Sequence, residues 1–379
     1  MRVVNDGPKS DVLGHGRRVL GVGVIGCGYA AERLHLPALQ SLRIARVVAL
    51  ADTDSDRLAQ IGRKFGVAHR YPDYETLLQS PEVDAVGVCV PPLVHARVAL
   101  AALDAKKHVL VEKPLCLDVN EAHRLVEHAE RCPVVAMMGF NLRYHRHVRA
   151  ARQAIACGLL GTVELVRTVW SSRATAAERL PAWRRCQESG GGVLHELAVH
   201  HVDLWSFLLG SEVEEVFAWR PAGSRESDTT VLTARSRDGV LTVSSFSQHA
   251  GEAHEIVVYG DGGRLRVSPY RFDGFEIAPP TRRSGDFVSR LRSLAGGLRA
   301  FPSGISTLRR GGAFLDSYRC EWQHFAEHAL TGRPCESPLR DGQRALELVL
   351  GAVESSRTGR PVDVSRRRGS PGATVPRHG

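Results

Sequence analysis

The stretch VGVIGCGYAAERLHL, residues 22–36, decides the fold of the N-terminal half. Its branched apolar residues at 22–26 predict a buried strand, and a helix is expected from about residue 30. Between them, Gly26, Gly28 and Ala31 form a G-x-G-x-x-A pattern. The first glycine allows a tight turn, the second lets a pyrophosphate approach the backbone, and the small third residue lets helix and strand pack closely. The stretch therefore predicts a Rossmann-type dinucleotide-binding site.

A carboxylate about twenty residues further on strengthens this prediction. Asp52 ends the apolar run 46–51, where an acidic side chain bonds ribose hydroxyls and repels a 2′-phosphate. We therefore expect NAD rather than NADP. Tyr29 and Ala30 lie inside the glycine pattern and are expected to line the same cofactor site. The alternative is a glycine turn that holds no ligand.

The two halves of the chain differ in hydrophobic periodicity. Strand-like runs at 22–26, 46–51, 84–90, 108–112 and 134–139 alternate with helical segments near 30–42, 54–66, 94–105 and 119–131, which predicts a parallel sheet with helices on both faces. Later runs at 162–170, 213–219, 229–235, 240–247, 254–260 and 263–268 alternate apolar with polar residues, which predicts an antiparallel sheet with one solvated face. Two helices near 314–331 and 341–357 end the fold. The predicted organisation is a mobile leader at 1–18, a Rossmann domain at 19–150, a substrate and oligomerisation domain at 151–362 and a disordered basic tail at 363–379.

Composition limits the class of protein. Of 379 residues, 43% are hydrophobic and 24% charged, and no apolar run is long enough to span a membrane. The N-terminus lacks the pattern of a signal peptide, so we expect a cytoplasmic protein without a membrane partner. The net charge of +9 comes from the tail and from residues 281–310 rather than from a folded face rich in aromatics, so no nucleic-acid partner is expected. The alternative for 281–310 is contact with an anionic ligand or a neighbouring subunit. The eight cysteines are scattered along the sequence without a C-x-x-C pair, which predicts free thiols.

A second stretch, GGGVLHELAVHHVDLW at residues 190–205, concentrates polar side chains. His195 and His200 are five residues apart, about 140° around an ideal helix, so they do not share one metal ion and no metal site is predicted. Glu196, His200 and Asp203 follow at spacings of four and three and form one polar stripe. A carboxylate beside a histidine fixes its tautomer and raises its pKa toward the range of a general base. The alternative is a solvent-facing stripe that only supports the helix.

Three strings together resemble the glucose–fructose oxidoreductase / inositol dehydrogenase / MocA (Gfo/Idh/MocA) family over residues 19–362. They are the 190–205 stretch, GFNLRYHRHVRAARQAIACGLLGTV after the sixth strand-like run, and VCVPPLVHARVALAALDAKKHVLVEKPL, which holds Pro91, Pro92, His95, Glu112 and Lys113. The resemblance implies a Rossmann domain followed by an open, mostly antiparallel sheet. It implies that Lys113 is the active-site lysine, that these prolines, His95 and Glu112 lie beside the cofactor, and that the protein is a homodimer or homotetramer.

The family pattern usually has an aspartate where this chain has Glu196 and a glycine where it has Ala198. The longer glutamate leaves open the geometry at the reacting carbon, and with it the substrate. Further substrate-contacting candidates lie after the sixth strand and around the glycine run: Asn141, Arg143, Tyr144, Trp183 and Asp203.

The resemblance and the residues together predict an NAD-dependent dehydrogenase that acts on a CH–OH group of a sugar, aminosugar or cyclitol. His200 would take the hydroxyl proton, Lys113 would stabilise charge on the same oxygen, and Glu196 would orient His200 or hold a neighbouring hydroxyl. Arginine outnumbers lysine heavily, as in GC-rich genomes, where relatives often act on sugars of secondary metabolites. The alternatives are a ketoreductase of a nucleotide-linked keto-sugar, a redox-neutral NAD-dependent glycosidase and a non-catalytic dinucleotide sensor.

Overall fold

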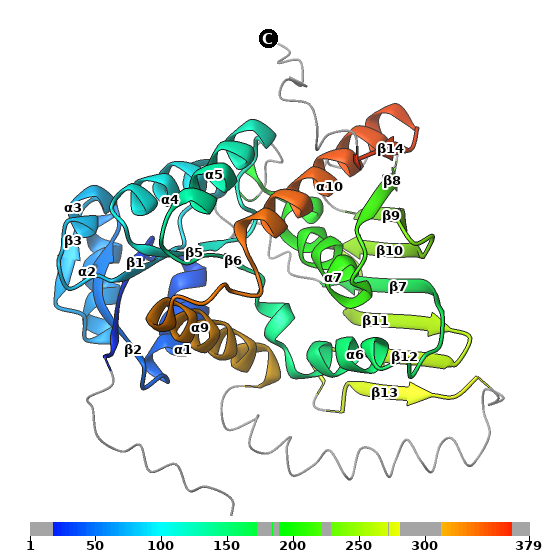
Figure 1. The fold of residues 1–379 in the computed structure, drawn as a ribbon. Coiled ribbons are helices and arrows are strands. Elements are labelled where there is room, and N and C mark those ends of the chain that lie inside the picture. The colour runs from blue at the N-terminus through cyan, green and yellow to red at the C-terminus, as the bar shows by residue number, and fades with distance from the viewer. Residues whose placement is uncertain are drawn as a thin grey trace, which may run out of the picture.

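The computed structural model describes residues 18–172, 184, 189–221, 229–271, 273–280 and 312–365. Two sheets lie next to each other, each with its own helices, and the long helix α10 runs along both (Figure 1). Most of the expected leader and the whole 281–310 segment lie outside the described residues. Within the described residues, no helix is both long and apolar enough to span a membrane.

The first sheet has six strands and every pair in it is parallel. The strands are β1 (Leu20–Ile25), β2 (Ala45–Ala51), β3 (His69–Tyr71), β4 (Ala85–Val88), β5 (His108–Glu112) and β6 (Ala136–Gly139), in the order β3-β2-β1-β4-β5-β6. The order of the strands reverses at β1 and β4: β2 and β3 lie on one side of β1, and β4, β5 and β6 lie on the other. Ligands of such sheets bind beyond the carboxyl ends of the strands at this point. The predicted Rossmann fold is confirmed.

Three of the four helices that follow the nucleotide-binding helix in this domain begin directly after a capping aspartate. The four helices are α2 (Ser55–Phe65), α3 (Tyr74–Leu78), α4 (His95–Asp104) and α5 (Val119–Arg131), with a short 3₁₀ turn, η2 (Pro92–Val94), before α4. The Asp54 and Asp118 carboxylates accept hydrogen bonds from Arg57 N and Glu121 N at the starts of α2 and α5. The helix expected near 30–42 begins with a π-helical turn, η1 (Ala31–His35), and continues as α1 (Leu36–Gln40).

The second sheet has eight strands, in the order β13-β12-β11-β7-β10-β9-β8-β14. They are β7 (Val163–Ser171), β8 (Val213–Trp219), β9 (Thr229–Ser236), β10 (Leu241–Ser247), β11 (Ala253–Gly260), β12 (Gly263–Val267), β13 (Phe275–Ala278) and β14 (Val362–Asp363). All neighbouring pairs are antiparallel except β7–β10. The helices packed on it include α6 (Arg146–Ala156), which contacts β12, and α10 (Leu339–Thr358), which contacts β8. Along β9 buried residues alternate with half-buried or exposed ones, as predicted for a strand with one face in the core.

The last two helices differ from the prediction in where they pack. Helix α9 (Ala313–Thr331) was expected in the second domain, but Trp322 and Phe325 are buried in the core of the first. Gly87 of β4 makes room for this helix, because a Cβ at Gly87 would lie 3.0 Å from the Trp322 ring. The chain therefore returns to the Rossmann domain after the second sheet, and a single boundary near residue 150 does not describe the packing.

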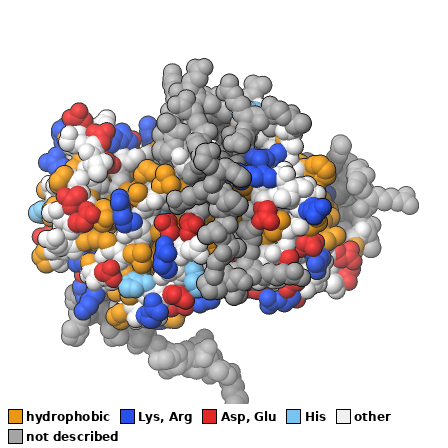
Figure 2. Space-filling view, turned by 90° about the horizontal axis from the view of Figure 1, so that it is seen from above, with side chains coloured by type: hydrophobic (Ala, Val, Ile, Leu, Met, Phe, Trp, Pro, Cys, Tyr) orange, Lys and Arg blue, Asp and Glu red, His pale blue; other side chains and the backbone are white. Residues whose placement is uncertain are grey.

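The ends of the folded part also differ by a few residues from the prediction. Arg18, placed in the leader, forms an ion pair with Asp84. Asp363, placed in the disordered tail, belongs to β14, and Val364 is fully buried against Gly351 of α10. Residues 366–379 lie outside the described residues. On the face drawn in Figure 2, basic and acidic side chains of the described residues are interspersed rather than gathered by sign.

Candidate active site

The loop between β1 and η1 carries the G-x-G-x-x-A pattern at the carboxyl edge of the first sheet. Gly26 has φ +93°, and a Cβ there would lie 2.6 Å from the Cys89 carbonyl oxygen, so the turn itself requires glycine. At Gly28 a Cβ would meet no atom within 4 Å, so the fold does not require glycine there. The open space over Gly28 and the exposed Tyr29 leave room for a pyrophosphate at the start of the helix. Ala31 is fully buried, as close packing of helix on strand demands.

Asp52 lies beside this loop, directly after β2. Its Oδ2 accepts a hydrogen bond from Cys27 N at 2.6 Å, and its Oδ1 accepts one from Asp54 N at 2.9 Å. These bonds fix the carboxylate next to the glycine loop, and each oxygen keeps a second lone pair for a ribose hydroxyl. The residues present thus fit NAD.

Lys113 follows β5 and reaches the second domain. Its Nζ donates a hydrogen bond to the main-chain oxygen of Glu196 at 3.1 Å. Burial lowers the pKa of Lys113, and the carboxylates of Glu112 and Glu196 oppose that effect. A partly buried ammonium held this way is suited to stabilise negative charge on a substrate oxygen.

The Glu112 side chain was expected beside the cofactor, but it faces the interior. Its Oε1 lies 2.8 Å from His35 Nε2 and its Oε2 accepts a hydrogen bond from Lys113 N at 2.9 Å. Burial would raise the pKa of Glu112, but the hydrogen bond from His35 and the charge of Lys113 outweigh burial and lower the pKa below its usual value. Glu112 is therefore an ionised carboxylate that anchors the lysine loop.

His95, Pro91 and Pro92 were also expected beside the cofactor. Both ring nitrogens of His95 are used: Nδ1 lies 2.7 Å from Pro114 O and Nε2 lies 2.8 Å from Val90 O. His95 is buried, so it joins the loops after β4 and β5 instead of facing a ligand. Pro91 is exposed and Pro92 is buried. The Pro92 ring packs against Gly190, where an added Cβ would lie 3.0 Å from the ring atoms. This contact brings the glycine run of the second domain to the first.

His200 lies at the start of α7 (Val199–Leu209), which continues from a π-helical turn, η7 (Leu194–Ala198). Burial and the nearby Lys113 charge lower the pKa of His200 well below its usual range, although Glu112 opposes them. Its Nδ1 has no hydrogen-bond partner within the described residues. The imidazole is therefore neutral at pH 7 and able to accept a proton.

Glu196 corrects one prediction. Its carboxylate lies 3.1 Å from Arg184 Nε, and it is not among the groups that shift the pKa of His200. The prediction that Glu196 raises the pKa of His200 is wrong, because the pKa is lowered. The physical reason is burial, which together with the charge of Lys113 lowers the pKa of His200, while the Glu196 carboxylate pairs with Arg184.

Arg143 and Asp203, two predicted substrate contacts, bind each other. Arg143 Nε donates to Asp203 Oδ2 at 2.8 Å and a second nitrogen donates to Asp203 Oδ1, while Nη1 donates to Asp341 Oδ2 at 2.7 Å and to Glu336 O at 2.9 Å. Both side chains are buried, and burial raises the pKa of Asp203 to about 6 although Arg143 opposes it. Asp203 of α7 is thus the buried partner of Arg143 and does not belong to a polar stripe that is open to solvent.

Asn141 and Tyr144, in the 3₁₀ turn η3 (Asn141–Tyr144), are buried as well. Asn141 Nδ2 donates to Ser317 Oγ at 2.9 Å, and the Tyr144 hydroxyl lies 3.7 Å from Met137 Sδ. These contacts tie β6 to α9 and leave neither side chain on an open surface. Trp183, the remaining substrate candidate, lies outside the described residues.

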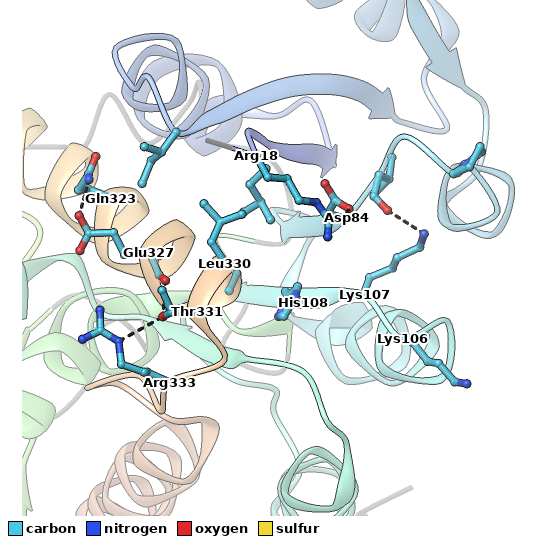
Figure 3. Close-up of a pocket in the computed structure, with 15 residues that line it drawn as sticks. Arg18, Asp84, Lys106, Lys107, His108, Gln323, Glu327, Leu330, Thr331 and Arg333 are labelled. Atoms are coloured by element: carbon cyan, nitrogen blue, oxygen red, sulfur yellow. Dashed lines mark hydrogen bonds and ion pairs between the residues drawn. The ribbon is translucent and has the colours of Figure 1, made fainter. Parts of the chain in front are cut away.

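In the described part of the chain, neither a cluster of metal-ligating side chains nor the large cavity of the first domain coincides with the site. Among the described residues, no group of three or more His, Cys, Asp or Glu side chains is placed to hold a metal ion. A cavity of about 640 Å³ opens at the opposite edge of the first sheet, between the amino ends of β1, β4 and β5 and the end of α9 (Figure 3). Its polar side chains bind neighbouring protein groups: Arg18 pairs with Asp84, and Lys107 Nζ donates to two carbonyls. It is remote from the glycine loop and Lys113.

Two family models match this chain. The model of an oxidoreductase family with an NAD-binding Rossmann fold matches residues 20–140, and that of the GFO/IDH/MocA C-terminal domain matches residues 148–266. The chain belongs to the Gfo/Idh/MocA family. It is an NAD-binding oxidoreductase, as the sequence predicted.

Relatives in the Gfo/Idh/MocA family span nearly the whole chain. Myo-inositol 2-dehydrogenase of Thermotoga maritima is 31% identical over 343 residues, which cover 88% of this chain and 95% of the relative. A dTDP-3,4-didehydro-2,6-dideoxy-alpha-D-glucose 3-reductase of Actinomadura kijaniata is 31% identical over 247 residues, 64% of this chain and 73% of the relative. The crystal structure of a probable dehydrogenase from Thermotoga maritima superposes with a TM-score of 0.74 at 27% identity, covering 92% of this chain and 99% of that one.

Two buried titratable residues near the site, His35 and Glu321, were not predicted from the sequence. His35 ends the very stretch that decides the fold, yet its partners Glu112 and Trp322 are 77 and 287 positions away. The only signal in the sequence was a histidine at an apolar position of the nucleotide-binding helix. Glu321, a fully buried glutamate on α9, gave no signal at all.

Proposed function

We propose that this protein transfers hydride between NAD and a secondary alcohol or ketone of a sugar, aminosugar or cyclitol. The observation that carries the proposal is the meeting of Lys113 with the 190–205 stretch, next to a glycine loop that fits NAD. An ammonium and a neutral imidazole at one place are what oxidation of an alcohol needs. Bound NAD supplies the hydride acceptor or donor.

In this proposal each catalytic residue has one task. In the oxidative direction, His200 takes the hydroxyl proton, and its lowered pKa keeps it unprotonated at neutral pH. Lys113 donates a hydrogen bond to the same oxygen and stabilises its developing charge. Glu196 holds Lys113 through its main-chain oxygen, and its carboxylate, paired with Arg184, is placed to accept from a neighbouring substrate hydroxyl.

The geometry of the loop supports the proposed cofactor residues. Gly26, Gly28 and Ala31 accommodate the pyrophosphate, with Tyr29 and Ala30 at the same turn. Asp52 accepts from the ribose hydroxyls, which favours NAD over NADP. Pro91 is exposed after β4, where an adenosine or nicotinamide face can rest against it.

One alternative substrate class has a specific observation in its favour. The relative from Actinomadura kijaniata is named as a reductase of a dTDP-linked keto-sugar. A nucleotide-linked substrate would bring a diphosphate, and the basic residues 281–310, outside the described residues, would be its expected contact. The same Lys113 and His200 would then act in the reductive direction.

A substrate panel tests these proposals. Purified protein is mixed with NAD, or with NADP, and with sugars, aminosugars and cyclitols, and the absorbance of reduced nicotinamide is followed. We expect reduced cofactor to appear with NAD and at least one member of the panel, and more slowly with NADP. The reverse assay supplies NADH with a dTDP-linked keto-sugar. Tight NAD binding without turnover in either direction would contradict the proposal and favour a redox-neutral or sensor role.

We also propose that the protein forms a homodimer or homotetramer through the second sheet. Its outer face carries exposed apolar side chains in register: Trp219 of β8 lies opposite Val231 of β9, with Leu241 and Val243 on the adjacent β10. All four side chains are exposed, and a group of neighbouring exposed apolar side chains on one sheet face is typical of a protein–protein contact.

The double variant Val231→Asp/Val243→Asp is expected to reduce the molecular mass measured by size-exclusion chromatography with light scattering to that of a monomer. Two buried carboxylates per protomer would oppose association because their desolvation is unfavourable. Leu159→Asp, at a more exposed apolar residue outside the sheet, serves as the control and should leave the mass unchanged. A monomeric wild-type protein, or an assembly that survives the double substitution, would refute this interface.

A further inference from the structure

His35 connects three parts of the first domain in its interior. It ends η1, the first turn of the nucleotide-binding helix, and is fully buried. Its Nε2 lies 2.8 Å from Glu112 Oε1, and its Nδ1 accepts a hydrogen bond from Trp322 Nε1 of α9 at 3.0 Å. A ring nitrogen that accepts a hydrogen bond carries no proton, so Trp322 fixes the tautomer and His35 donates its Nε2–H to Glu112.

The Glu112 carboxylate, which is held by His35, also contacts the main chain of Lys113. Its second oxygen accepts from the main-chain N–H of Lys113 at 2.9 Å, so the carboxylate is held from two sides. Among the opposite charges near Lys113, that of Glu112 does most to counter the effect of burial on the lysine's pKa. A carboxylate that lost its donor in this interior would take up a proton and stop compensating the ammonium.

We propose that His35 is a positioning residue, which holds the Glu112 carboxylate against Lys113 so that the lysine stays cationic and in place at the reacting oxygen. The role at the reacting oxygen rests on the proposed function, whereas the effect on the charge of Lys113 does not. His35 lies on the helix that receives the cofactor, so the same contact joins the cofactor site to the lysine loop.

Other titratable or charged groups lie near His35, Glu112 and Lys113. They are Cys89 after β4, His95 of α4, Arg184, Glu196 of η7, His200 of α7, and Tyr318 and Glu321 of α9. Glu321 offers a natural comparison with Glu112. It is fully buried, neither of its oxygens has a hydrogen-bond partner among the described residues, and burial raises its pKa well above the usual range. Glu321 is therefore neutral, while Glu112 is ionised.

The test measures the pKa of Lys113 directly. The chain has only five lysines, Lys9, Lys64, Lys106, Lys107 and Lys113, so protein labelled with ¹³C at lysine Cε gives few resonances. Lys113→Met identifies the signal of Lys113, and its shift is then followed against pH in the wild type and in each variant. No turnover is needed for this measurement.

His35→Leu removes the donor, whereas His35→Gln keeps an N–H that reaches Glu112. We expect His35→Leu to lower the pKa of Lys113 by about one unit or more, because a nearby opposite charge shifts a pKa by that much. His35→Gln should restore most of the wild-type value. Trp322→Phe replaces the indole with a smaller aromatic ring that carries no N–H, so it keeps most of the buried apolar packing, and it should lower the pKa of Lys113 by about half a unit because His35 can then become cationic.

Glu321→Gln is the matched control. It replaces a neutral carboxyl with a neutral amide at a site as buried as Glu112, so the pKa of Lys113 should stay unchanged, whereas Glu112→Gln should lower it. An unchanged pKa in His35→Leu, or in Trp322→Phe if His35→Leu does not fold, overturns the proposal. If the pKa shifts as expected but Lys113→Met retains turnover, the proposed function fails and this inference stands.

Discussion

Lys113→Met is expected to lower kcat/KM for the best substrate of the panel by about 10³-fold. The lysine ammonium lies beside His200 and is compensated by Glu112 and Glu196, so its charge is available to an oxygen at the site. Methionine keeps a side chain of similar shape as far as Cε and removes the ammonium with its charge and its donors. NAD affinity, measured by calorimetry, should change little because the glycine loop and Asp52 are untouched.

Lys106→Met is the control for this variant. Lys106 is exposed and lines the cavity at the far edge of the first sheet, so the same substitution should leave kcat/KM unchanged (Figure 3). Retention of more than a tenth of the wild-type kcat/KM by Lys113→Met, with NAD still bound, would remove the lysine from the mechanism. His200 alone would then have to account for the chemistry.

The fold could be predicted because its signals are local. The G-x-G-x-x-A pattern, the apolar run of β1 and Asp52 lie within about thirty residues, and the structure joins them as expected. The second sheet was predicted from the alternation along strands such as β9. Helix α9 was assigned to the second domain, although it packs in the core of the first. Amphipathic periodicity shows that one face of a helix is buried, but it does not show which domain buries that face. Gly87, which admits Trp322, could not be matched to α9 from the sequence.

The site was predictable where a backbone motif defines it and not where side chains choose partners at long range. Lys113 does reach the 190–205 stretch. Glu196, His200 and Asp203 were assigned to one stripe on an ideal helix, but the Glu196 carboxylate pairs with Arg184, and Asp203 pairs with Arg143, sixty positions away. Polar residues after a strand end can face a ligand or anchor the next helix, and only three-dimensional contacts distinguish the two.

Arg143→Met is expected to lower the free energy of unfolding by about 3–5 kcal/mol, because it leaves a buried carboxylate without its partner. Arg143 holds Asp203 of α7, Asp341 of α10 and the Glu336 main-chain oxygen, and methionine fills similar volume without any donor. Urea unfolding followed by circular dichroism at pH 7 measures the loss. Arg149→Met, which breaks an exposed pair with Glu336, should cost less than about 1 kcal/mol.

The pH dependence of this variant separates an anchoring role from a substrate contact. Burial already raises the pKa of Asp203 to about 6, and loss of Arg143 raises it further. A carboxyl whose pKa is higher in the folded than in the unfolded state contributes stability at low pH and loses it as pH rises through the folded value. The deficit of Arg143→Met should therefore grow from pH 6 to pH 8, while KM for the substrate stays within about threefold of wild type, a difference below 1 kcal/mol. A large rise in KM with unchanged unfolding free energy would instead mean that Arg143 contacts the substrate, as the sequence alone had indicated.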